Sequence, residues 1–351
     1  MSAKQASDPG AFFQTTDWFE LLAQHSLPAG TPLQWLMVTT DGSPILCLPL
    51  IQKTGSLASL SNFYTPLYAP LLLRDGLTAS DWPMDSMPAR ALSAIAVFLR
   101  RHQPCPAVIQ LQPLDTSGAF YSAMRNALTS AGYAVDHYFC FGNWNLPCSG
   151  LSFADYFAQR PSAVQNTVHR ARKKLDRAGP WTVDIHTQPG ELLDTAISAF
   201  ETIYQRSWKP AEAFPDFVRR LCILAAQKGK LRLGVLSLDG IAIASQIWLV
   251  DQGKAYIFKL AYDPDAARFS PGSLLTASLM EHVLDCDAVD EIDYLSGDDA
   301  YKQDWMSHRR ERHGLIAFDL AMPRGIFAAA RHYGGKKLRA WRAGKTACPA
   351  T

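Results

Sequence analysis

The sequence predicts an α/β (α+β) protein made of two versions of one unit, each with a mixed antiparallel and parallel, twisted sheet flanked by helices. Short apolar runs with strand-like alternation lie between longer segments of helical periodicity. The order helix, antiparallel strands, helix, strand, helix, strand occurs once in each half of the chain. The 351 residues, 48% hydrophobic and 19% charged, suffice for two domains with full cores.

The first unit is expected over residues 1–150. It begins with a helix over 12–25, for which Thr16 or Asp17 is the N-cap, and continues with a hairpin that turns at Asp41-Gly42. An irregular, aromatic-rich segment follows. The remaining elements are a helix over 88–102, a strand over 107–114, a helix over 120–131 and a strand over 133–146.

The second unit is expected over residues 151–322, followed by a basic helical tail over 323–351. Ser152 caps a short helix, and Pro161 opens a longer helix that ends at Gly179. The elements that follow are a strand, helices over 191–208 and 216–228, a meander of three strands, a helix from Ser270 to about 284, and strands over 289–296 and 314–320.

Composition predicts a reduced compartment. The net charge is +2, and the seven cysteines are scattered, odd in number and without a C-x-x-C pair. The first residues contain no apolar signal region, and no run of 18 apolar residues occurs. We expect a cytoplasmic protein, with peripheral contact at the inner face of the membrane as an option. Without H-E-x-x-H or a Walker A loop, no metal is expected.

The segment "RFSPGSLL" predicts an anion site at the start of a helix. Ser270 is expected to be the N-cap, and the backbone amides of Gly272, Ser273 and Leu274 would face outward with the positive end of the helix dipole. A pyrophosphate suits such a site. A well-capped helix that binds nothing is the alternative. The preceding strand, which ends at Tyr262, alternates in polarity.

Two further segments are basic. The helix after Pro161 carries Arg170 and Lys173 among six cationic or histidine side chains, which form either a solvated face or a site for a phosphate-rich ligand. After Asp319 the chain has no acid, and basic and apolar residues alternate there. This tail is either a contact to a membrane surface or polyanion, or an end whose charge only aids solubility.

The run "IDYLSGDDAYKQDW", with the basic helix, "AYIFKLAYDP" and "SPGSLL", resembles the acyltransferase domain of cellulose-biosynthesis-type proteins. That family belongs to the GNAT superfamily and is related to the FemAB peptidyltransferases. The resemblance covers residues 151–320 and implies tandem GNAT-like units, of which the first is degenerate. It implies an acyl-CoA donor along the strand that ends near Tyr262, with its pyrophosphate at residues 272–274.

Acyl transfer from a thioester to an amine requires a proton donor for the leaving thiolate and a base for the amine. Tyr301 is the expected general acid. Asp298 is the expected base, provided that partial burial raises its pKa. Lys302 is expected to bind an acidic acceptor or a phosphate. The structural alternatives are a helix cap for Asp298, packing for Tyr301 and a solvated position for Lys302.

Three functions follow from this reading. The first is an acyl-CoA-dependent N-acyltransferase that acts on an amine of a cell-envelope, polysaccharide, amino-sugar or amino-acid acceptor. The second is a FemAB-like transferase that takes its aminoacyl group from charged tRNA, the one case in which a nucleic-acid partner is expected. The third is a non-catalytic GNAT-like scaffold of an envelope-polysaccharide complex.

Overall fold

The computed structural model describes residues 11–346 except 75–76, 78–81 and 103–104, and it describes side chains up to residue 338. The strands are β1 (Leu33–Thr40), β2 (Ser43–Lys53), β3 (Ser56–Ser59), β4 (Leu71–Leu72), β5 (Val108–Leu114), β6 (Ala134–Pro147), β7 (Trp181–His186), β8 (Leu231–Leu238), β9 (Ile241–Asp251), β10 (Lys254–Tyr262), β11 (Glu291–Asp293) and β12 (His308–Phe318). The helices are α1 (Thr16–His25), α2 (Met87–Arg101), α3 (Ala119–Ser130), α4 (Phe153–Ala158), α5 (Ser162–Ala178), α6 (Glu191–Arg206), α7 (Pro215–Gln227), α8 (Pro271–Glu281), α9 (Lys302–Trp305) and α10 (Pro323–Thr346), with 3-10 helices η1 (Phe12–Gln14) and η2 (Pro264–Phe269) and a π-helical turn η3 (His282–Cys286).

The chain forms two compact units, whose limits differ from the predicted ones. Unit 1 comprises the residues up to 23, residues 27–140 and those from 312 on, whereas unit 2 comprises residues 24–26 and 141–311. The chain leaves unit 1 inside β6 and returns inside β12, so the expected boundaries at 150 and 322 fall elsewhere and the basic tail belongs to unit 1. Each of these two strands continues through the crossing point without a break, so the boundary between the units falls inside a strand and not in a loop.

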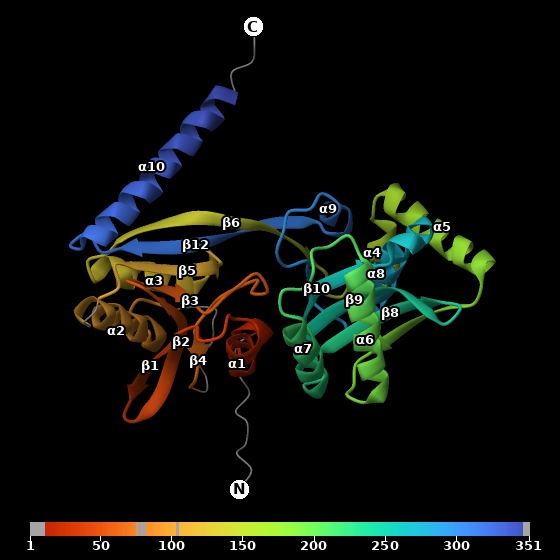
Figure 1. Ribbon diagram of the computed structural model, residues 1–351, viewed down its shortest axis with the longest axis horizontal. Helices are drawn as coiled ribbons and strands as arrows, with labels where there is room; N and C mark the ends of the chain where they lie inside the picture. Colours follow the sequence, from red (N-terminus) through yellow and green to blue (C-terminus); the bar gives the residue numbers. More distant parts are fainter. Residues whose placement is uncertain (1–10, 75–76, 78–81, 103–104, 347–351) are drawn as a thin grey trace. The chain divides into compact units, whose positions relative to one another are not determined.

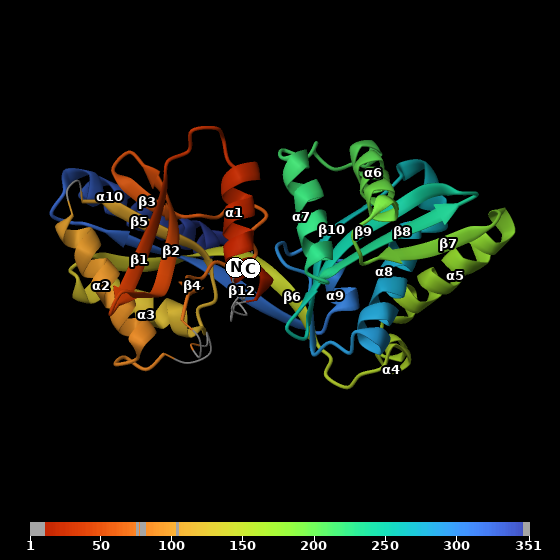
Figure 2. The same cartoon turned by 90° about the horizontal axis from the view of Figure 1, so that it is seen from below.

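The sheet of unit 2 has the strand order β6-β11-β10-β9-β8-β7. β8, β9 and β10 form the predicted antiparallel meander, with turns at Asp239-Gly240 and Gln252-Gly253 in which all four φ angles are positive. Figure 2 shows α6 and α7 on one face of these strands and α8, with α5 packed on it, on the other. Gly234 of β8 allows close packing, because a Cβ there would lie 2.9 Å from Leu279 Cδ1 of α8.

Strands β10 and β11 separate after a short parallel pairing. Only three residue pairs join them, the last being Tyr256 with Asp293, whereas β10 continues to Tyr262. A register shift in β10 between Ile257 and Lys259, opposite β9, marks the place where the strand changes course. The second half of β10 therefore has no ladder to β11, which leaves space between this half and the segment after β11.

Unit 1 repeats this plan. β1, β2 and β3 form an antiparallel meander, α2 follows, and β5 pairs parallel with β3. The strand order of unit 1 is β1-β2-β3-β5-β12. Helices α2 and α3 lie side by side (Figure 1). The predicted fold class, two units with mixed antiparallel and parallel sheets and flanking helices, is thus confirmed. Among the described residues, no helix is both long enough and apolar enough to span a membrane.

Candidate functional site

Unit 2 contains a cavity of about 370 Å³ at the place where β10 leaves β11. Its lining comes from four parts of the unit: the segment after α6, the strands β9 and β10, the start of α8, and the segment from β11 to α9. The lining residues are Trp208, Lys209, Gln246, Leu260, Tyr262, Gly272, Ser273, Thr276, Tyr294, Asp299, Tyr301 and Trp305. Aromatic walls with a few polar groups are typical of a pocket for a small molecule or a part of one.

The start of α8 contributes two of the four predicted residues to this cavity. Gly272 and Ser273 line it, and a Cβ on Gly272 would lie 3.3 Å from Tyr262 Cδ1. Leu274 is buried, and its N–H donates to the Ser270 carbonyl at 3.3 Å, so this amide is not directed to a ligand. Ser270 adopts the left-handed conformation (φ 51°), and its side chain caps no amide of a described residue, contrary to the prediction.

Gln246 fixes this helix start against the sheet. Its Nε2 donates to the carbonyl of Gly272 at 3.0 Å and to Thr276 Oγ1 at 2.8 Å, while its Oε1 accepts from Trp248 Nε1 at 2.9 Å. All its hydrogen-bonding atoms are therefore used, as burial requires. The sequence carried a signal for this role that the prediction missed: a glutamine in the middle of the otherwise apolar strand "IAIASQIWLV".

Tyr301 lies at the cavity as expected. Its side chain is 44% exposed, and its ring packs edge-on against Tyr294 with the centroids 5.8 Å apart. Partial burial, together with the nearby Asp299, raises the pKa of Tyr301 to about 12. The phenol is therefore protonated at neutral pH and is able to donate its proton.

Asp298, the predicted base, does not line the cavity. Its carboxylate accepts from Arg309, with Nη2 at 2.6 Å and Nε at 3.0 Å, and from Trp144 Nε1 at 2.9 Å. The hydrogen bonds from Arg309 lower the pKa of Asp298, whereas a base for an amine requires a raised one. Asp298 is also no helix cap: Tyr301 is the residue before α9, and no side chain among the described residues caps that helix.

Lys302 is buried, and its ammonium binds the chain's own backbone. Nζ donates to the carbonyls of Ser296 at 2.7 Å, Gly297 at 3.2 Å and Tyr294 at 3.4 Å, and it pairs with Asp299 at 3.3 Å. Burial lowers the pKa of this lysine. Its donors are thus occupied, which differs from both the substrate-binding role and the solvated position considered from the sequence. Lys302 closes the loop that carries Tyr301.

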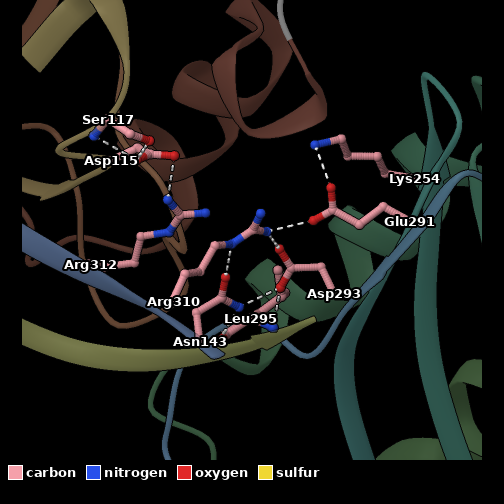
Figure 3. Close-up of polar contacts among 9 residues, drawn as sticks. All are labelled: Asp115, Ser117, Asn143, Lys254, Glu291, Asp293, Leu295, Arg310 and Arg312. Carbon is pink, nitrogen blue, oxygen red and sulfur yellow. Dashed lines mark hydrogen bonds and ion pairs between the residues drawn. The ribbon is translucent and has the colours of Figure 1, made fainter. Parts of the chain in front are cut away.

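A polar network holds the beginning of the same loop (Figure 3). Asp293 Oδ1 accepts from the N–H of Leu295, which has a φ of 54°, and from Asn143 Nδ2, both at 2.6 Å. Arg310 donates to the other oxygen of Asp293, to Asn143 Oδ1 at 2.6 Å and to Glu291 Oε1 at 2.6 Å. The conformation that directs the chain toward Tyr301 is therefore fixed by strands β6, β11 and β12.

Lys209 is a cavity residue that the sequence did not predict. Its Nζ donates to the Leu260 carbonyl at 2.5 Å and lies 5.8 Å from the ring centroids of Trp208 and Tyr204. Burial, helped by the charges of Lys259 and Lys302, lowers the pKa of Lys209 to about 8. Trp208 and Lys209 lie in a loop after α6, and no sequence motif or periodic pattern connects them with the cavity.

The two predicted binding residues on α5, Arg170 and Lys173, are exposed and lie outside the cavity. Lys174 Nζ donates to the Arg268 carbonyl at 2.6 Å, which brings one flank of α5 to η2, the segment just before α8. Arg170 is one helical turn from both Lys173 (i+3) and Lys174 (i+4), so the two predicted residues are neighbours on the surface of α5.

Residues 162–303 match the family model of the acetyltransferase (GNAT) domain. A search of curated proteins finds no match. In fold the chain is similar to FemX (TM-score 0.60, 14% identity, 90% of this chain and 94% of that one). It is also similar to L-PGS from Bacillus licheniformis (TM-score 0.51, 10% identity, 92% and 95%) and to the C-terminal domain of a putative lysylphosphatidylglycerol synthetase from Agrobacterium fabrum (TM-score 0.50, 12% identity, 82% and 84%). The cavity of unit 2 therefore lies largely within the region that matches the GNAT acetyltransferase model, in a chain whose fold is similar to that of FemX.

Proposed function

We propose that this protein is an N-acyltransferase that moves an acyl group from acyl-CoA to an amine of a cell-envelope, polysaccharide, amino-sugar or amino-acid acceptor. One observation carries the proposal: a cavity opens where β10 leaves β11, beside the start of α8, in the region that matches the GNAT model. The names of two proteins of similar fold, a lysylphosphatidylglycerol synthetase and L-PGS, favour an acceptor of the cell envelope.

The donor site would combine the helix start with the basic flank of α5. The amides of Gly272 and Ser273 and the helix dipole favour a pyrophosphate, and Gly272 leaves room for its approach to the backbone. Lys174 contacts η2, which precedes this helix, and Arg170, one helical turn away on α5, adds positive charge. The acyl end of the donor would then follow β10 past Tyr262 and Leu260 into the cavity.

The reaction needs two proton transfers, for which the cavity offers two side chains with oppositely shifted pKa values. The amine nitrogen attacks the thioester carbonyl carbon, the C–N bond forms and the C–S bond breaks. Tyr301, whose pKa is about 12, gives its proton to the leaving thiolate. Lys209, whose pKa is about 8, takes the proton of the amine in place of the predicted Asp298.

The second candidate donor is a charged tRNA. The likeness in fold to FemX and the exposed cations of α5 favour it, because a tRNA backbone requires an extended basic surface. A peripheral position at the cytoplasmic face of the membrane is a further part of the proposal. It is supported by α10, in which Ile326 and Phe327 are exposed among basic residues. The basic and apolar side chains of the predicted tail from residue 339 on lie outside the described ones.

A thermal-shift and kinetic comparison tests the proposal. Acetyl-CoA or longer acyl-CoA should raise the melting temperature of the wild type, because a ligand that binds only the folded state stabilises it. Tyr301→Phe should keep this shift and lower kcat by about 100-fold, the usual size of a general-acid contribution.

The absence of a shift with every acyl-CoA would overturn the acyl-CoA proposal. Binding of charged tRNA that weakens steeply with added salt would then favour the second candidate. If Tyr301→Phe binds the donor and has the kcat of the wild type, the donor assignment is kept and Tyr301 is not the general acid.

A further inference from the structure

Unit 1 contains two adjoining cavities that the proposed transfer reaction does not use. The larger has a volume of about 790 Å³ and the smaller about 300 Å³. Lys53, Ser56 and Leu57, at the end of β2 and in β3, line both of them. We call the two together the cationic groove. Its other walls come from β1, β5, β12, the end of α2 and the start of α10.

The groove has an excess of positive charge. Arg324 lines the larger cavity and Arg331 the smaller one, with Lys53 between them, while none of the described lining residues is Asp or Glu. In the part of the chain that the structure describes, Lys53 and Arg324 have no carboxylate partner. Asp319, which precedes α10, is buried and already paired with Arg100. Lys53 and Arg324 are therefore not neutralised by an ion pair with any described residue.

The two central cations lie beside one tight turn. Gly55 has a φ of +74°, and a Cβ at this position would lie 3.0 Å from Nη1 of Arg324. The guanidinium thus covers the backbone of the turn that directly follows Lys53. An arginine over a bare backbone, next to a lysine, provides several N–H donors that match the geometry of a phosphate group.

The wall beside these cations is apolar. Leu36, Leu99 and Met322 line the larger cavity, and Phe98 adds a ring that is 50% exposed. The Phe98 ring stacks on His102 with the centroids 4.9 Å apart. Charge at one side and exposed apolar surface at the other suit an amphiphilic anion better than a fully hydrated one.

We propose that the cationic groove of unit 1 is a second ligand site, which binds a phosphate-bearing molecule with an apolar or ring-containing part. Lys53 and Arg324 hold the phosphate, and Leu36, Phe98 and Met322 contact the rest. A lipid headgroup and a soluble nucleotide share this chemistry. Occupancy of the groove does not depend on transfer at the cavity of unit 2.

Isothermal titration of the full-length protein tests the site with two probes, dihexanoyl phosphatidic acid below its micelle concentration and ADP. At least one should bind the wild type. The double variant Lys53→Glu, Arg324→Glu should raise its Kd about tenfold or more, because like charges then face the phosphate. The matched control Arg125→Glu, an exposed charge reversal on α3 of the same unit, should leave the Kd unchanged.

The outcomes separate the sources and the sites. Loss of phosphatidic acid binding in the double variant identifies a lipid phosphate, and loss of ADP binding identifies a soluble one. The site is overturned if neither probe binds the wild type or if the double variant binds as well as the wild type. It is also overturned if Gly272→Glu, at the donor site of unit 2, abolishes all binding and the double variant does not. Melting temperatures without ligand check folding, and Lys53→Gln and Arg324→Gln replace the double variant if it unfolds.

Discussion

The helix that joins the two parallel strands begins differently in the two units. In unit 1 this helix is α2, between β3 and β5, and the Oγ of Ser86 accepts the N–H of Ala89 at 3.4 Å. In unit 2 it is α8, between β10 and β11, and no side chain of the described residues caps it. The two units share one arrangement of strands and helices. In unit 1 the start of α2 is capped by a side chain of the protein, whereas in unit 2 Gly272 and Ser273 at the start of α8 line a cavity.

The strand edges beyond the parallel pairs differ in the same sense. In unit 1, Ser59 Oγ donates to the Gln112 carbonyl at 2.8 Å and accepts from its N–H at 3.0 Å, and the Tyr68 N–H donates to the Pro113 carbonyl at 2.7 Å. The chain thus covers β5 where β3 ends. In unit 2 the corresponding place is the cavity between β10 and the segment after β11. The comparison teaches that the same framework contains a packed core or an open cavity according to whether the chain fills this one place.

The largest expected effect comes from placing a carboxylate at the open helix start. Gly272→Glu should abolish the stabilisation by acyl-CoA and the transfer activity, because a negative charge would stand where the pyrophosphate binds, at a cost of several kcal/mol. Thermal shift and titration calorimetry measure this. Met87→Glu, at the closed start of α2, is the matched control and should change neither quantity. Wild-type donor affinity in Gly272→Glu would remove the donor site from α8.

The next largest effect concerns the base. Burial lowers the pKa of Lys209 to about 8, so its neutral form is populated above that pH and its charged form below. The kcat/KM of the wild type should therefore rise with pH, reach half of its maximum near pH 8 and level off above that pH, and Lys209→Met should lower it about 100-fold and remove this dependence. Lys337→Met, an exposed lysine of unit 1, should keep the wild-type profile. If kcat/KM of Lys209→Met still rises with pH in the same range, the titrating group is not Lys209.

The third effect is on stability. Lys302→Met should lower the free energy of unfolding by about 1–3 kcal/mol, because the carbonyls of Ser296 and Gly297 lose their buried donor. Denaturant unfolding measures the difference. Lys173→Met, a change of the same type on the exposed face of α5, should stay within about 0.5 kcal/mol of the wild type. If the two variants were equally stable, Lys302 would not be what closes the loop.

The smallest effect sharpens the comparison of the two helix starts directly. Ser86→Ala should cost about 0.5–1 kcal/mol, the usual loss when an N-cap is removed from a helix. Ser270→Ala should cost less, because the Ser270 side chain caps no described amide. Urea titrations of the two variants give the difference, and a larger loss for Ser270→Ala would mean that α8 is capped after all.

The sequence predicted most of the elements and the two segments that meet at the cavity of unit 2, but not the contacts of the charged residues there. The position of "IDYLSGDDAYKQDW" after a strand, beside the helix start at Gly272, followed from periodicity and resemblance. The ion pair of Asp298 with Arg309 could not be predicted in this way. Arg309 lies in the run "HRRERH", whose charged residues give no strand signal although they form the first half of β12. These charges are compatible with a strand since ion pairs such as Arg310 with Glu291 and Asp293 satisfy them.

The interior position of Lys302 could not be predicted for a related reason. A lysine is rarely buried, and only the fold reveals that three carbonyls of one loop converge on its ammonium. Lys209 shows the reverse: its loop has no pattern, and the low pKa arises from the surroundings that unit 2 assembles around it. Residue identity thus predicted where chemistry is possible, and burial decided which groups remain available for it.

The return of the chain to unit 1 within β12 has a consequence for the order of folding during synthesis. β5 pairs with residues 313–318 of β12, which leave the ribosome after every residue of unit 2. The unit that is begun first is therefore completed last, against the usual order in which an N-terminal domain finishes before the next one starts. Until then, one edge of β5 has no partner strand, so unit 1 cannot be completed before all of unit 2 has been synthesised.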